Sequence, residues 1–323
     1  MLPLRMAFFM RVTLAVSLLL AVIQKSTAQK AVPDTVRAGV YVISVHDINF
    51  RDKEYTMRFW LWFLYNNPDF DFSRQLDIPN AKEIDIQEII TDSLDGKAWV
   101  IMKMKCTMKQ NWSVHNFPFD RQKLKMHIEN TLFDRRSLVF VPDEPGSTFD
   151  KDDALDGWTI RGFRVSEAKN SYPTGFGSGD NDPQDFSSFN VTLDLERNAW
   201  GLFMKIFLGM YIAFLIATIS FTPHPSEMEP RFGLPVGGLF AAVGNKYIID
   251  SILPESSAFT LVDTLHALTF IGIFGTLLVS AIALKQHDRG QTALAEETNR
   301  KGARMVISLY VLANLVFVGL ALL

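Results

Sequence analysis

The sequence predicts a β-sandwich domain, on the extracellular or periplasmic side, followed by an all-α domain of four transmembrane helices. Two observations support this: a polar first part with short alternating segments, and a second part with four long apolar runs. Of the 323 residues, 48% are hydrophobic and 21% charged, and the mean hydropathy is +0.11. Because a soluble domain rarely averages above zero, we expect part of the chain to lie in lipid.

Charge and cysteine content exclude several classes of protein. Lys and Arg number 32 against 35 Asp and Glu, a net charge of -3, which gives no support to a nucleic-acid binder. Cys106 is the single cysteine, which excludes an internal disulfide and a cysteine-rich zinc site. The six histidines lack metal-binding spacing, and no nucleophile–base–acid pattern occurs. We therefore expect no metal, no cofactor and no enzyme activity.

Residues 1–28 have the pattern of a signal peptide. Arg5 and Arg11 precede an apolar run over residues 12–23, and residues 26–28 have the small-x-small form of a cleavage site. The run is short for a membrane span, although an uncleaved anchor helix is the alternative. A cleaved leader places the domain that follows outside the cytoplasm.

Residues 29–199 are expected to form the sandwich. Seven short segments alternate between apolar and polar residues and are bounded by turn formers such as Asp95-Gly96 and Pro142. The predicted strands are residues 36–48, 55–65, 98–108, 123–129, 137–141, 158–166 and 186–195. Many short strands with little helical periodicity favour an antiparallel β-sandwich.

Residues 200–323 are expected to form the membrane domain. The apolar runs are residues 201–221, 232–253, 259–284 and 305–323, each near the roughly 20 residues that a bilayer requires. With the sandwich exported, the connection over residues 285–304 lies in the cytoplasm. Its five basic residues fit the positive-inside rule. A multi-pass membrane protein with the lipid bilayer as partner is therefore predicted.

This order of parts resembles the pentameric ligand-gated ion channels, the family that includes the Cys-loop receptors. The sharpest match is Asn-Phe-Pro-Phe-Asp-Arg-Gln at residues 116–122, which is similar to the family's signature loop at the base of the sandwich. The two cysteines of that loop are missing, since Gln110 and Leu124 stand at their spacing. In lacking these cysteines, and in having a short link between the third and fourth helices, the sequence resembles the bacterial members. The resemblance implies a homopentamer in an inner membrane, with the sandwich facing the periplasm.

The resemblance also implies a junction that couples ligand binding to pore opening. The residues that match this junction are Asp52, Glu54, Phe117, Pro118, Phe119, Asp120, Arg197 and Pro254. Arg197 ends the last predicted strand. A buried guanidinium requires a carboxylate partner, and the candidates are Asp120, Asp52 and Glu54. The alternative is a solvated surface ion pair.

The second apolar run matches the pore-lining helix of the family, and its opening Arg-Phe-Gly-Leu is similar to that of some members. One helical face, with residues spaced by four and three, collects Gly233, Gly237, Phe240, Gly244, Tyr247 and Ser251. Phe240 is the candidate gate, because an apolar ring closes a pore by dewetting. Glu229, before the helix, would form a carboxylate ring at the cytoplasmic mouth and favour cations as the permeating inorganic ions.

Other interpretations of this helix remain open. Gly233 and Gly237 form a Gly-x-x-x-Gly pattern that is typical of helix packing. Pro230 and Arg231 resemble the anion-selective members, and the face lacks the hydroxyl groups of many conducting members. The alternative function is therefore a non-conducting membrane-bound periplasmic ligand sensor or scaffold with the same fold. Further along, Lys246 and Asp250 are four residues apart and are expected to pair.

The resemblance implies an agonist site between adjacent sandwiches, where aromatic side chains hold cations or small amphiphiles. By position, residues 129–133 fall in one binding loop and residues 169–185 in the loop that caps the site. The aromatic candidates are Trp60, Trp62, Tyr65, Phe133, Tyr172 and Phe176. The alternative for about half of them is the sandwich core, because aromatic residues pack there in any β-domain. The expected agonist is a small molecule or a proton.

Overall fold

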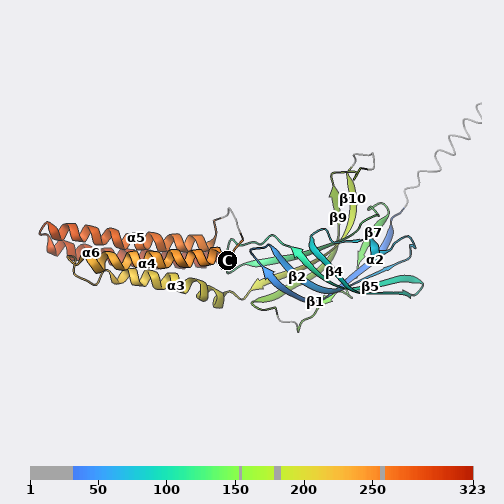
Figure 1. The fold of residues 1–323 in the computed structure, drawn as a ribbon, viewed down its shortest axis with the longest axis horizontal. Coiled ribbons are helices and arrows are strands. Elements are labelled where there is room, and N and C mark those ends of the chain that lie inside the picture. Colours follow the sequence, from blue (N-terminus) through green and yellow to red (C-terminus); the bar gives the residue numbers. More distant parts are fainter. Residues whose placement is uncertain (1–31, 153–154, 178–182, 255–258, 323) are drawn as a thin grey trace, which may run out of the picture.

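The chain folds into a strand-rich domain followed by a bundle of four long helices. The two domains lie end to end, and the four helices lie side by side (Figure 1). The structure is a computed structural model that describes residues 32–152, 155–177, 183–254 and 259–322. The predicted signal peptide, residues 1–28, lies outside the described residues. The two-part architecture predicted from composition is confirmed.

Two sheets build the strand-rich domain. The larger sheet has the order β4-β5-β2-β1-β7, with β8 also paired to β1, and the smaller has the order β3-β6-β10-β9. Neighbouring strands are antiparallel, except that β7 and β8 run parallel to β1. The larger sheet contains β1 (Asp34–Asn49), β2 (Glu54–Tyr65), β4 (Ala81–Leu94), β5 (Lys97–Lys109), β7 (Leu138–Pro142) and β8 (Thr148–Phe149). The smaller contains β3 (Leu76–Asp77), β6 (Arg121–Asn130), β9 (Trp158–Tyr172) and β10 (Gln184–Arg197), and a short helix α2 (Phe72–Gln75) precedes it.

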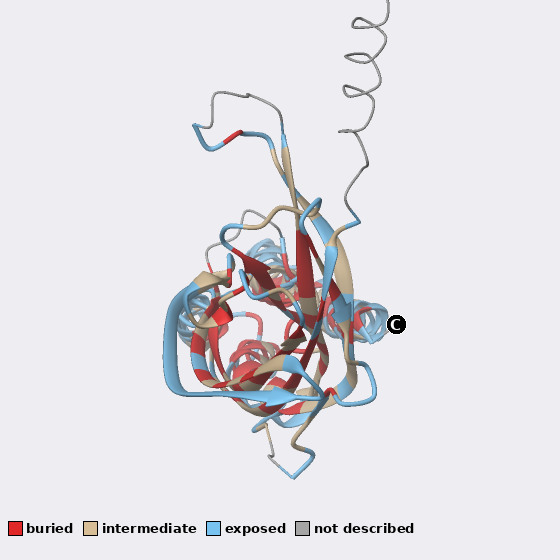
Figure 2. Ribbon diagram, turned by 90° about the vertical axis from the view of Figure 1, so that its right-hand side faces the viewer, coloured by how far each residue is buried: buried red, intermediate tan, exposed pale blue. Residues whose placement is uncertain are grey.

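The core lies between the two sheets, as the buried segments in Figure 2 show. Strand β2 illustrates how the sequence produces it, since side chains alternate between the faces of a strand. Every second residue from Tyr55 to Tyr65 is buried, whereas Arg58, Trp60 and Trp62 are half-buried on the opposite face. All seven predicted strands are present. Strands β3, β4 and β8 were not among the predicted strands, and the residues of β4 are almost all exposed in the single chain.

Four helices follow, each long and apolar enough to cross a membrane: α3 (Ala199–Ile219), α4 (Met228–Asp250), α5 (Leu261–Asp288) and α6 (Thr292–Ala321). Helix α3 begins directly after β10, so the last strand leads into the bundle. The third and fourth helices extend beyond their predicted apolar runs and meet at a turn around Gly290, whose φ of 79° suits glycine at a helix end. The link predicted at residues 285–304 is therefore largely helical.

Candidate ion pathway and domain junction

An ion pair between Asp120 and Arg197 lies at the base of the sandwich. The Arg197 Nε donates to Asp120 Oδ1 over 2.6 Å, and Nη2 donates to Oδ2 over 3.2 Å. The side chains are 2% exposed for Asp120 and 10% for Arg197. Of the three carboxylates considered as partners for Arg197, the structure therefore places Asp120 against it, in two-pronged and nearly dry contact.

Aromatic rings enclose the guanidinium of Arg197. Its carbon lies 3.9 Å from the ring centre of Trp158, 4.7 Å from that of Phe50 and 5.0 Å from that of Phe117. The negative faces of aromatic rings attract a cation, most strongly where water is excluded. Gln122 completes the arrangement, because its amide donates to Asp120 Oδ2 over 2.5 Å. The pair is thus held on several sides.

The loop that carries Asp120 also contacts the membrane helices. Phe119 packs its ring against Trp200 and Phe203 of α3, with centroids 5.2 and 5.4 Å apart. The backbone N–H of Leu261, the first residue of α5, donates to the carbonyl of His115 over 2.8 Å. Pro118 follows Phe117 through a cis peptide bond in the same loop. A shift of this loop therefore acts on two helices at once.

Asp52 and Glu54 are not partners of Arg197. Asp52 accepts a hydrogen bond from Asn49 Nδ2 over 2.7 Å, and Glu54 pairs with Lys82 at 2.6 Å. The turn between β1 and β2 instead lies over the end of α4. A cavity of about 520 Å³ is lined from above by the turn residues 51–53 and from below by residues that include Tyr247 and Ser251. Pro254, just after α4, is buried.

Helix α4 has one exposed face and one packed face. The six residues of the predicted stripe are all exposed in the single chain, and Phe240 and Tyr247 are 72% and 78% exposed. The opposite face, which includes Arg231, Ala242 and Ile249, is buried in the bundle, where α4 contacts α3 and α5. The 4-3 spacing therefore corresponds to one continuous surface of this helix.

Glycines on the two faces of α4 differ in what surrounds them. A Cβ added at Gly238 would stand 2.6 Å from the carbonyl oxygen of Ala213 in α3, a distance too short for a side chain. A Cβ at Gly233, Gly237 or Gly244 would meet nothing within 4 Å. Close packing of α4 against α3 thus depends on Gly238, and the Gly-x-x-x-Gly pattern of Gly233 and Gly237 makes no helix contact inside one chain.

At the amino-terminal end of α4, Arg231 and Glu229 face different surroundings. Glu229 is exposed, whereas Arg231 is fully buried. The Arg231 guanidinium donates to the carbonyl of Pro223 over 2.9 Å and to Asn299 Oδ1 of α6 over 2.7 Å. Its charge is therefore directed into the bundle and away from the stripe.

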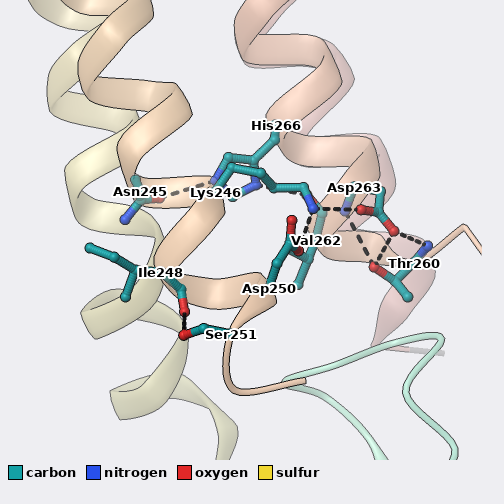
Figure 3. A network of polar contacts seen from close by, with 9 residues as sticks. All are labelled: Asn245, Lys246, Ile248, Asp250, Ser251, Thr260, Val262, Asp263 and His266. Atoms are coloured by element: carbon teal, nitrogen blue, oxygen red, sulfur yellow. Dashed lines mark hydrogen bonds and ion pairs between the residues drawn. The ribbon is translucent and has the colours of Figure 1, made fainter. Parts of the chain in front are cut away.

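Near the carboxyl-terminal end of α4, polar side chains join α4 to α5 (Figure 3). Lys246 contacts Asp250 one turn along and reaches Asp263 of α5 at 2.8 Å. Asp263 also accepts hydrogen bonds from the N–H and hydroxyl of Thr260, over 2.8 and 2.7 Å, and so caps α5. The expected Lys246–Asp250 contact is thus present, and sequence reasoning missed the third member that ties α4 to α5.

Asn245 adds a second tie beside this one. Its amide N donates to the carbonyl of Ile206 in α3 over 3.0 Å. Its Oδ1 lies 3.0 Å from Nε2 of the buried His266 of α5, as Figure 3 shows. Movement of the outer half of α4 therefore requires contacts to both neighbouring helices to rearrange.

A polar and aromatic cluster lies beneath the hairpin of β9 and β10. The buried carboxylate of Glu129 accepts hydrogen bonds from Tyr172 Oη over 2.9 Å and from Asn170 Nδ2 over 2.7 Å. Burial and the neighbouring Glu129 raise the pKa of Tyr172 to about 12, so the hydroxyl remains a donor. Tyr172 and Phe176 also form a ring triangle with Phe186, with centroid separations of 5.6 to 6.3 Å.

Sequence reasoning missed Asn170 and Phe186 in this cluster. No single-strand pattern identifies them, because their proximity depends on the pairing of β9 with β10, which sets Phe186 opposite Asn170. No described cation forms an ion pair with the Glu129 carboxyl group, whose partners are Asn170 and Tyr172. The cluster thus offers a carboxylate and three aromatic rings.

The remaining aromatic candidates lie elsewhere in the single chain. Phe133 packs on Phe70, and Tyr65 packs on Phe70 and Phe72 in the core. Trp60 lies under the ammonium of Lys103 at 5.4 Å. Trp62 donates from its indole N–H to Asp143 over 3.2 Å. Only Tyr172 and Phe176 of the six predicted residues contact each other directly within the described rings.

Comparisons with known proteins point to receptor subunits. Over 187 residues, 58% of the chain, the sequence is 19% identical to a gamma-aminobutyric acid receptor subunit beta of Caenorhabditis elegans. Over 179 residues it is 20% identical to the corresponding subunit of Lymnaea stagnalis. These alignments cover only 32% and 34% of the relatives' own lengths. No family model matches the chain.

The alignments and the architecture agree. Both relatives are subunits of Cys-loop pentameric channels, and the chain has distant homology to them. Four helices able to span a membrane follow the sheet domain, so this is a multi-pass membrane protein.

Proposed function

We propose that this distant homologue of the Cys-loop receptor subunits is itself a subunit of a homopentameric ligand-gated ion channel whose pore is lined by α4. The observation that carries the proposal is the exposed stripe of α4 opposite its packed face. The hydropathy of α4 is 1.2, against 2.2, 2.3 and 1.9 for α3, α5 and α6. Since charged and weakly apolar segments are costly in lipid, α4 is the helix best placed around a water-filled axis.

In this arrangement the copies of Phe240 from the subunits surround the pathway at one level, and the copies of Tyr247 surround it at another. Gly233, Gly237 and Gly244 leave wider sections between and below them, because no side chain fills that space. An apolar ring narrow enough to exclude water forms a barrier to ions without any covering lid. Phe240 is the proposed gate.

The proposed pore is expected to select cations over anions. Glu229 is exposed at the cytoplasmic mouth, where five copies would attract cations. The nearby Arg231 is buried and bonded to Pro223 and Asn299, which removes its charge from the mouth. The resemblance of this segment to anion-selective members therefore carries less weight than the directions of the two side chains.

The cluster around Glu129 is proposed as the agonist site, and its chemistry favours a small amine. A protonated amine would donate hydrogen bonds to the Glu129 carboxylate and lie against the faces of Tyr172, Phe176 and Phe186. The relatives' printed names refer to gamma-aminobutyric acid, which carries such a group. Glu129→Gln is expected to weaken amine binding at least tenfold, and Glu167→Gln serves as the control because Glu167 instead pairs with Arg135. Equal binding by both variants would contradict the assignment.

Binding at this cluster would act on the pore through the junction. Strand β10 carries Phe186 near its start and Arg197 at its end, and the loop bonded to Arg197 contacts α3 and α5. The ligand would shift an equilibrium between closed and open forms by no more than its difference in affinity for them.

Cysteine accessibility tests the pore directly. The native Cys106 is buried, and burial raises its thiol pKa to about 12, so it reacts little with aqueous thiol reagents. Phe240→Cys, Gly244→Cys and Tyr247→Cys should react with a charged methanethiosulfonate in lipid, and Ala242→Cys, on the packed face at 0% exposure, should not. Equal reactivity on both faces, or none on the stripe, would contradict a pore along α4.

The alternative function is a non-conducting ligand sensor or scaffold of the same fold. The face that lines the proposed pore has one hydroxyl at Ser251 and one at Tyr247, so it offers few groups to replace the water around an ion. A sensor would bind the amine and rearrange at the junction without passing current.

A further inference from the structure

A cavity of about 850 Å³ lies on the outward face of the larger sheet. It extends from Ser44 and His46 of β1, across Arg58 of β2 to Lys105 of β5. Its lower wall includes Trp158 and Arg197 of the domain junction. It is separate from the cluster around Glu129, whose residues do not line it.

Two cations meet in this cavity. Arg58 stands opposite Lys105 in the ladder between β2 and β5, and opposite Ser44 in the ladder between β1 and β2. Directly opposed side chains on one face have Cβ atoms about 4.5–5.5 Å apart, and like charges at that spacing repel. A sheet that places Arg against Lys therefore needs a negative charge nearby.

Among the described residues, no carboxylate is paired with either cation. The side chains of Arg58 and Lys105 form no ion pair or hydrogen bond with any described residue, and the Nε atom of Arg58 is buried without a partner. Asp85 is opposite Lys105 on β4, but no ion pair joins the two. Of the other charged groups of the cavity, Asp47 lies 3.6 Å from His46, Arg197 is bonded to Asp120, and the carboxylate of Asp156 is paired with neither Arg58 nor Lys105.

We propose that Arg58 and Lys105 form a binding site for a small multivalent oxyanion, a phosphate or a carboxylate. A guanidinium presents a planar fork of donors that matches two oxygens of such an anion, and the lysine adds a point charge. Ser44, His46 and Gln87 also line the cavity and offer further hydrogen-bonding groups. The volume exceeds that of a single small ion and accommodates an anion with several charged groups.

The test uses the full-length chain in detergent micelles, with inorganic phosphate and citrate as probes. Isothermal titration at constant ionic strength separates binding from general salt effects. Wild type is expected to bind one or both anions, and Arg58→Gln and Lys105→Gln to weaken binding about tenfold or more. Lys97→Gln removes a lysine from the exposed start of the same strand and should bind as wild type does.

Thermal unfolding provides a second readout that does not depend on Arg58. In buffer without multivalent anions, Lys105→Gln should melt at a higher temperature than wild type, because it removes one of two opposed cations. Added phosphate or citrate should raise the melting temperature of wild type but not that of Lys105→Gln. This opposite ordering would not arise from a surface lysine of purely structural role.

Two results would overturn the proposal. One is absence of binding by wild type to either anion. The other is equal binding by wild type and Lys105→Gln. If wild type does not bind and Arg58→Gln dissociates the oligomer, the charge partner is a carboxylate of a neighbouring subunit and the site is an interface. Neither assay requires ion conduction, so failure here is distinguishable from failure of the proposed channel function.

Discussion

Replacing Asp120 by Asn should strongly destabilise the base of the sandwich. The substitution keeps the shape of the side chain but removes the charge that opposes Arg197. It leaves a guanidinium that is 10% exposed without its carboxylate. An amide N at this position would also face the donors of Arg197 or Gln122, which now bond to the two carboxylate oxygens.

The magnitude follows from the geometry. Breaking a buried ion pair by removing one partner costs about 3–5 kcal/mol. The three rings around Arg197 still attract the cation and offset part of that loss. We therefore expect the low end, about 3 kcal/mol. At about 2–4 °C per kcal/mol for a domain of this size, the melting temperature should fall by roughly 6–12 °C.

Tryptophan fluorescence during thermal unfolding measures this effect, since Trp158 lies 3.9 Å from the guanidinium carbon. Asp194→Asn is the matched control, because its pair with Arg164 is 3.5 Å long and well exposed. Exposed pairs contribute about 0–1 kcal/mol. A shift for Asp120→Asn no larger than that of the control would refute the claim that this pair holds the junction.

Two further predictions concern helix packing and acid sensitivity. Gly238→Ala should destabilise the bundle by about 1–3 kcal/mol, because the added Cβ would clash with the carbonyl oxygen of Ala213. Gly237→Ala, whose Cβ would stand in open space, should stabilise α4 by up to about 1 kcal/mol. Equal effects of the two substitutions in denaturant unfolding would contradict the assigned faces. The Arg161 guanidinium lowers the pKa of Glu196 below its usual 4.5, so this stabilisation is present above that pH and lost as the pH falls through the lowered value. Arg161→Gln should thus melt below wild type at neutral pH, with the difference shrinking in acid, and a difference independent of pH would count against the pairing.

Much of the architecture was predictable because it depends on local patterns. The four apolar runs and the alternation of strands such as β2 reflect burial that each segment shows by itself. The pairing of Asp120 with Arg197 was among the sequence candidates, because a buried guanidinium requires a carboxylate. Choosing Asp120 over Asp52 required the fold, which directs the turn after β1 toward α4.

The remaining features depend on partners distant in sequence. The burial of Arg231 is set by Pro223 and Asn299, which no spacing rule connects to α4. Lys246 reaches Asp263 only because α5 packs beside α4. Similarly, the opposition of Arg58 and Lys105 follows from strand register, which single-strand patterns do not specify.

Membrane current through Phe240→Ala, measured beside wild type in asymmetric salt, tests the central claim most directly. Phe240 is 72% exposed, so its truncation should leave the fold intact while it widens the proposed gate. Ile248→Ala is the control, because Ile248 is 64% exposed but lies off the stripe. A pore lined by α4 predicts a leak current for Phe240→Ala and not for Ile248→Ala. The reversal potential of that current should be shifted toward the equilibrium potential of the cation. Absence of current through a Phe240→Ala protein that is assembled in the membrane would contradict a pore along α4 and favour the non-conducting sensor.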